Sequence, residues 1–297
     1  MLIRGLSFAA VVTLLMIGPS LVSAQEQLAW KFSAGESLNY VVKQKMNMTL
    51  DVAGKQQTIV MNQMMDMQWK IADVDSGSGD ANMAQTIARV QMDSQGGQLG
   101  SLKFDSSSEE IQSTPFGKAI SAVYKKLIGE NFGVHMQSTG KIDDVKVPES
   151  LLASLKQSGS TGNALDENTL KQLMTQSAIT LPSSPITPGH TWESMQQVEM
   201  PFGSMVVKSK LTFQGIDPGT GYAQIAMIPS ISLIAKPGTD VDMKLTKTEG
   251  NGTMLFDVAR GRIKKSDLHL TMVMQTNSFG QIINKTIEQT TSMTLEN

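Results

Sequence analysis

Hydrophobic and polar residues alternate with a period of two along most of the chain. Between Thr58 and Ile71 the odd positions are mostly apolar and include Met61 and Trp69, whereas the even positions are mostly polar. Successive side chains of a strand point to opposite faces of a sheet. We therefore predict a strand over residues 58–71 with one buried face.

The preceding segment continues this pattern. Most even positions between residues 42 and 52 are apolar, and a two-residue turn at Ala53-Gly54 would place Met46 opposite Met61. In that register both apolar faces lie on the same side, which a slip of one residue would destroy. The two segments are therefore expected to form a hairpin with one methionine-rich face.

Similar alternation recurs at residues 205–213, 268–274 and 283–295, with threonine, glutamine and lysine on the opposite side. Antiparallel sheets commonly bury one face and leave the other in water. The fold class predicted is mainly β with minor α, in the form of a large curved antiparallel sheet or an incomplete barrel.

Helical spacing replaces the alternation in the middle of the chain. Apolar residues recur every three or four positions after Pro115 and after Pro148, and Asp166 can cap a further helix. We expect short helices at about 115–129, 148–157 and 166–178.

Three short sequence matches, in the same order, suggest an internal repeat. The matched pairs are FSAGESL (32–38) with ITPGHTW (186–192), VDSGSGDA (74–81) with IDPGTGYA (216–223), and STGKI (138–142) with ARGRI (259–263). Residues 25–297 are therefore interpreted as a single domain of two pseudo-repeats, about 28–147 and 184–297. A helical segment and a proline-rich linker join them.

The first 24 residues have the features of a signal peptide. Arg4 is followed by an apolar run from Leu6 to Ile17, and small residues precede the expected cleavage between Ala24 and Gln25. The apolar run is short for an uncleaved anchor, because the hydrocarbon core of a bilayer is about 30 Å thick. We expect an exported protein, periplasmic or extracellular, with no transmembrane span in the mature chain.

Composition excludes several classes of function. The 297 residues include no cysteine, which excludes disulfides and thiol chemistry. The 25 basic and 27 acidic residues are evenly spread, so no basic patch predicts nucleic-acid binding. The three histidines have no metal-site spacing, and no catalytic motif is present. We therefore expect a protein that is not an enzyme and has no cofactor.

Two charged motifs allow a functional and a structural interpretation. Asp73, Asp75 and Asp80 could form a calcium loop, but the repeat at 216–223 keeps both glycines and only one carboxylate, which favours a hairpin turn. Arg89 lies among apolar residues, where it could face an acidic ligand. An outward orientation is favoured because unpaired charges are rarely buried. Arg260 and Arg262 flank a hairpin glycine, Gly261, and are expected at the surface.

The 21 methionines allow three interpretations. Thioethers can bind copper(I), but too few converge on one point and no histidine accompanies them. Methionine also suits pockets for variable apolar ligands, and it fills hydrophobic cores. The pocket and the core remain open alternatives. The residues that would line a pocket are Met46, Met48, Met61, Met65, Met67 and Trp69.

Several segments resemble a family of exported bacterial proteins of unknown function. The likeness is carried by Trp30-Lys31-Phe32, Gly35-Glu36, the methionine-rich hairpin and the turn Pro188-Gly189-His190-Thr191-Trp192, and it extends from Leu28 to Asn297. The resemblance implies export but no activity or catalytic residues. More distantly, the layout is similar to the periplasmic half-barrels that carry lipoproteins or lipids.

The leading hypothesis is a non-enzymatic binding module of the cell envelope for apolar, lipid-like ligands. Its partner would be an apolar small molecule or an envelope protein. The alternative is a structural or protein-interaction protein with a filled core and no small ligand.

Overall fold

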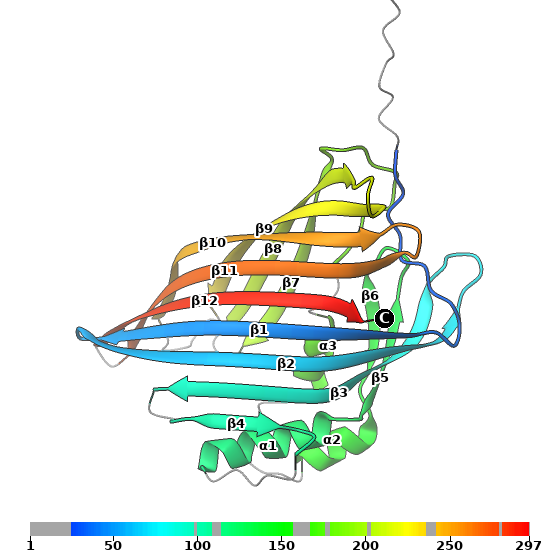
Figure 1. Ribbon diagram of the computed structural model, residues 1–297. Helices are drawn as coiled ribbons and strands as arrows, with labels where there is room; N and C mark the ends of the chain where they lie inside the picture. The colour runs from blue at the N-terminus through cyan, green and yellow to red at the C-terminus, as the bar shows by residue number, and fades with distance from the viewer. Residues whose placement is uncertain are drawn as a thin grey trace, which may run out of the picture.

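Twelve strands and three helices make up the protein in a computed structural model, which describes residues 25–97, 100–108, 114–156, 167–175, 179–200, 203–235, 242–278 and 281–296 (Figure 1). The strands are β1 (Ser37–Val52), β2 (Lys55–Val74), β3 (Ala81–Gly96), β4 (Leu102–Asp105), β5 (Asn131–Met136), β6 (Ile142–Lys146), β7 (Thr191–Met200), β8 (Gly203–Ile216), β9 (Tyr222–Ala235), β10 (Asp242–Asp257), β11 (Arg262–Ser278) and β12 (Gln281–Glu296). The helices are α1 (Pro115–Leu127), α2 (Glu149–Lys156) and α3 (Glu167–Thr175).

All the strands belong to one antiparallel sheet in the order β6-β5-β3-β2-β1-β12-β11-β10-β9-β8-β7, with β4 beside β3. The sheet curls, so that β7, β8 and β9 pass behind β10 to β12 in Figure 1. Among the described residues, β6 and β7 do not pair with each other, so the sheet is open. The prediction of a mainly β fold with a large antiparallel sheet is confirmed.

The hairpin of β1 and β2 has the predicted register. Met46 lies opposite Met61, and Leu38 lies opposite Trp69. Both turn residues have a positive φ, 52° at Ala53 and 79° at Gly54. This is the backbone of a type I′ turn, whose twist matches that of the flanking strands.

The three predicted helices are present and begin close to the expected residues. Thr114 caps α1 by accepting a hydrogen bond from the Gly117 amide at 3.0 Å, and Pro115 follows it in the first turn. The predicted cap Asp166 and the predicted helix ends at 157 and 178 lie outside the described residues. The helices contribute Leu127, Leu151, Leu155, Leu170 and Met174 to the buried core.

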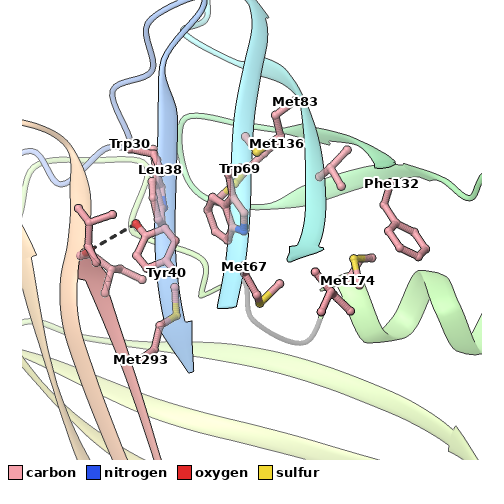
Figure 2. Close-up of a cluster of buried hydrophobic side chains, with 14 of the residues drawn as sticks. Trp30, Leu38, Tyr40, Met67, Trp69, Met83, Phe132, Met136, Met174 and Met293 are labelled. Atoms are coloured by element: carbon pink, nitrogen blue, oxygen red, sulfur yellow. Dashed lines mark hydrogen bonds between the residues drawn. The ribbon is translucent and has the colours of Figure 1, made fainter. Parts of the chain in front are cut away.

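An aromatic cluster lies at the centre of this core (Figure 2). The ring of Trp69 lies 4.9 Å from that of Tyr40 and 5.7 Å from that of Trp30, centroid to centroid. The Tyr40 hydroxyl donates to the Ile263 carbonyl oxygen at 3.3 Å, which ties β1 to β11. Burial raises the pKa of Tyr40 far above its ordinary value, so the phenol stays neutral.

Turns at the sequence matches have the same hydrogen bonds. The Asp75 carboxylate accepts from the amides of Gly77 and Ser78, and the Asp217 carboxylate accepts from the amides of Gly219 and Thr220. These bonds lower the pKa of both aspartates. Residues 74–81 therefore form a turn, as expected. The division of the chain into two pseudo-repeats remains a proposal that these turns support.

The N-terminal segment runs between two further turns. The Trp30 amide donates to the Ser138 carbonyl at 2.7 Å, and the Lys31 amide donates to the Gly261 carbonyl at 3.0 Å. Leu181 and Ile186, in the segment expected to be a linker, are buried in the core. This segment therefore contributes to packing. Ala24 and the rest of the expected signal peptide lie outside the described residues.

Candidate functional site

The methionine-rich face of the β1–β2 hairpin contains all six residues predicted to line a pocket. Because side chains alternate along each strand, the even positions of β1 and the odd positions of β2 share the face that carries the core. The structure divides the six into two groups. Met67 and Trp69 are buried, at 8% and 1% exposure. The half-exposed group is Met46, Met48, Met61 and Met65.

The two groups differ in exposure because other parts of the chain pack on one end of the face and not on the other. Near Trp69 the face packs against the N-terminal segment, through Trp30, and it shares one buried core with residues of α1, α2 and α3. The other end of β1 and β2 extends past these helices to the hairpin turn (Figure 1). One face of one hairpin is therefore a filled core at one end and half-exposed at the other.

The half-exposed end continues across four adjacent strands, because the register aligns apolar residues in rows. Met61, Met46 and Gln289 are in one row, and the next contains Ile59, Met48, Ile287 and Met272. Neighbouring strands lie about 4.8 Å apart, so such a row is roughly 14 Å wide. We call this region the open apolar surface. Its members are Met46, Met48, Ile59, Met61, Met272 and Ile287, all half-exposed.

A polar row separates the open apolar surface from the core. Gln44 lies between Gln63 and Thr291 on the same face. Gln63 donates to the Tyr124 hydroxyl at 3.2 Å, and the Tyr124 ring stacks on Phe104 with centroids 5.6 Å apart. Burial raises the pKa of Tyr124, which keeps this phenol neutral. The row can therefore offer neutral hydrogen-bonding groups to whatever lies on the surface.

Sequence reasoning missed four residues of this region: Ile59, Met272, Ile287 and Lys285. The first three follow the same period of two as the methionines, but alternation alone does not distinguish a binding surface from core. Lys285 lies on β12 between Ile283 and Ile287, on the apolar side of the strand. The register with β1 was the missing signal, because it aligns β12 with the methionine-rich hairpin.

The described residues contain no group of three histidine, aspartate or glutamate side chains that could hold a metal ion. His135 contacts Asp143 at 2.5 Å, and this hydrogen bond raises the pKa of His135 and lowers that of Asp143. His190 stacks on Trp192 with ring centroids 6.2 Å apart. These histidines therefore contact structural neighbours.

Two arginines, Arg89 and Arg262, are paired with acidic side chains. Arg89 forms a two-point ion pair with Asp105, with nitrogen–oxygen distances of 3.1 and 2.6 Å, and is about one-third exposed. The pair holds the pKa of Asp105 far below its usual range. Arg262, expected at the surface, is instead largely buried against Glu36 at the start of β1. It links the first strand to β11.

Residues 78–263 match a family described only as a family of unknown function, DUF6263. The chain belongs to this family. The matched range includes the Pro188–Trp192 turn, whereas the Trp30–Glu36 opening precedes it. The expected resemblance to a family without assigned activity is therefore confirmed. No curated protein is significantly similar to this DUF6263 member.

Three solved structures are distantly similar. A structure of lipovitellin, described for its lipid–protein interactions, has a TM-score of 0.48 at 13% identity, over 90% of this chain and 26% of lipovitellin. DynF, from dynemicin biosynthesis in Micromonospora chersina, has a TM-score of 0.26 at 8% identity, over 97% of this chain and 92% of DynF. An outer membrane channel of Pseudomonas putida F1 also has 0.26, at 6% identity, over 94% of this chain and all of the channel. The chain spans about a quarter of the length of lipovitellin.

No described helix of this DUF6263 member has the length and apolar character needed to cross a membrane.

Proposed function

We propose that this protein is an exported, non-enzymatic binding module of the cell envelope that holds an apolar, lipid-like ligand on its open apolar surface. The observation that carries the proposal is the row of half-exposed residues Met48, Ile59, Ile287 and Met272 beside a core that is already filled. Contiguous apolar patches that stay accessible at a protein surface often mark binding sites, and these residues are only partly buried. Methionine suits such a surface because its side chain is flexible and polarizable.

The alternative is a structural or protein-interaction role without a small ligand. The filled core around Trp69 favours it, because that end of the face has protein where a container would have space. The two roles differ in what covers the open apolar surface. A lipid carrier holds a ligand there, whereas an interaction protein holds an apolar segment of its partner.

The first test uses protein purified from its own cell envelope. Native mass spectrometry before and after solvent extraction would detect an extractable apolar ligand at about one per chain if the carrier proposal is correct. A single apo mass, with a melting temperature that extraction does not change, would contradict it. Export is tested on the same sample by N-terminal sequencing, which should begin at Gln25.

The second test places the ligand on the surface. A double variant, Met48→Gln with Met61→Gln, puts polar amides on the open apolar surface and should weaken binding of a fluorescent long-chain alcohol at least ten-fold, because two apolar contacts are lost. Met64→Gln is the matched control, since Met64 is also half-exposed on β2 but points to the opposite face. Equal affinities in the double variant and the control would locate the ligand elsewhere.

A further inference from the structure

Lys285 is a half-buried charged residue on a largely apolar part of the inner face, where the other charged residue of β1, β2 and β12 is the exposed Lys55 beside the hairpin turn. On β12 Lys285 lies on the same face as Ile283 and Ile287. It is opposite Leu50 of β1 and Met274 of β11. Its side chain is half-buried. The inner-face positions of the neighbouring stretches 38–52, 55–71, 266–276 and 283–295 include no aspartate or glutamate.

Two other lysines of the same sheet have acidic partners. Lys265 pairs with Asp267 at 2.7 Å, and Lys247 pairs with Glu249 at 3.0 Å. Among the described residues, Lys285 has no ion pair and no side-chain hydrogen bond. A half-buried lysine can lay its stem along apolar surface and keep a charged ammonium at the end of that stem. An anion beside the ammonium would form a charge-assisted hydrogen bond with it.

The position of Lys285 relative to the open apolar surface specifies the shape of such an anion. Ile287 follows Lys285 on the same face at about 7 Å along the strand, at roughly 3.3 Å per residue. The apolar rows extend from there toward the core. A ligand with its acidic group at Lys285 would therefore place an attached apolar chain on Met48, Ile287 and Met272.

We propose that Lys285 binds the acidic headgroup of an anionic amphiphile whose single apolar chain lies on the open apolar surface. This inference rests on the proposed function and adds the chemical class of the ligand. Lysine suits the role because its flexible stem lies along apolar surface while its ammonium donates up to three hydrogen bonds.

The test compares two ligands with equal chains, palmitate and hexadecanol, which displace a fluorescent long-chain alcohol below their aggregation concentrations. Wild-type protein should bind palmitate about ten-fold tighter, since a hydrogen bond to a charged group contributes that much. Lys285→Met should remove this preference and leave the affinity for hexadecanol unchanged. Lys285→Arg should restore the preference.

Lys43→Met is the matched control, because Lys43 is exposed on the opposite face of β1 and should influence neither affinity. Thermal unfolding of each variant shows that it is folded. Equal affinities of wild-type protein for the two ligands, or a preference that survives Lys285→Met, would overturn the headgroup proposal while leaving the proposed function standing. Absence of binding by both ligands would overturn the two together.

Discussion

The two ends of the β1–β2 hairpin have the same kind of sequence and different surroundings. Met67 and Met61 are six residues apart on one face of one strand, yet Met67 is buried and Met61 is half-exposed. Met67 belongs to the buried core, whereas Met61 is only partly buried where it packs against that core. The difference shows that a methionine-rich strand becomes core or partly exposed surface according to what packs on it.

The largest expected effect is a difference in the free energy of unfolding between variants at the two ends of the hairpin. Trp69→Ala should lower the free energy of unfolding by about 3–5 kcal/mol, because it leaves a cavity among buried aromatic rings. Met48→Ala, at the uncovered end, should cost less than about 1 kcal/mol. Urea unfolding measures both. A cost for Met48→Ala as large as that for Met67→Ala would mean that the open apolar surface is core.

The next effect concerns the packing of Trp30, in the N-terminal segment, on the turn at Gly140. Gly140 has a φ of 87°, and a Cβ there would lie 2.6 Å from the Ile179 carbonyl oxygen and 2.7 Å from Trp30 Nε1. Gly140→Ala should therefore add about 1–3 kcal/mol of overpacking to the cost of a left-handed alanine.

Gly189→Ala is the control for Gly140→Ala, because Gly189 has a φ of 90° but no atom within 4 Å of the added Cβ. It should cost only about 1–2 kcal/mol. Equal losses in the two variants, measured by urea unfolding, would show that Trp30 does not pack on the Gly140 turn in solution.

Oxidation gives a comparison without substitution. Dilute peroxide should convert Met46, Met48 and Met61 to sulfoxides much faster than the fully buried Met136 and Met174. Peptide mapping by mass spectrometry gives the rate at each position. Palmitate should slow the first three rates and leave that of Met64 unchanged. Equal oxidation rates at Met61 and Met67 would contradict the difference in exposure between the two ends of β2.

The smallest effect is a pH dependence at the covered end. Asp143 raises the pKa of His135, so the pair stabilises the fold fully below the unfolded histidine value of about 6.5. This contribution is lost as pH rises through the raised folded value. Because Asp143 has a lowered pKa, its share is present above about 4 and is lost as pH falls through that lowered value.

Both side chains are about one-third exposed, so solvent screening should keep the total below about 1 kcal/mol. Unfolding in urea between pH 5 and pH 9 measures it, with Asp143→Asn as the control that should flatten the profile. A profile that Asp143→Asn leaves unchanged would assign the dependence to other groups.

Much of the fold could be predicted from local pattern. The period of two determined the strand faces, and the Ala53-Gly54 turn determined the register of β1 with β2, because hairpin geometry links turn length to pairing. The pairing of β1 with β12 could not be predicted in this way. These strands are far apart in the sequence, and no turn connects them.

The candidate site was only partly predictable for the same reason. The face of Met46 and Met61 follows from alternation, whereas the burial of Met67 depends on Trp30 and on helices distant in sequence. Lys285 became a candidate only when β12 was placed beside β1. Arg262 was misplaced because its partner, Glu36, is 226 residues away.

The pairing of β1 with β12 also determines when the protein can finish folding. A ribosome makes β1 (Ser37–Val52) long before β12 (Gln281–Glu296), so one edge of the methionine-rich hairpin stays unpaired while all the strands between them are synthesised. Unpaired edges next to apolar faces are sites of aggregation, and contacts between distant residues form slowly. We therefore expect this edge to be prone to aggregation while it is unpaired, and loss of residues 281–296 would leave β1 without its partner on that side.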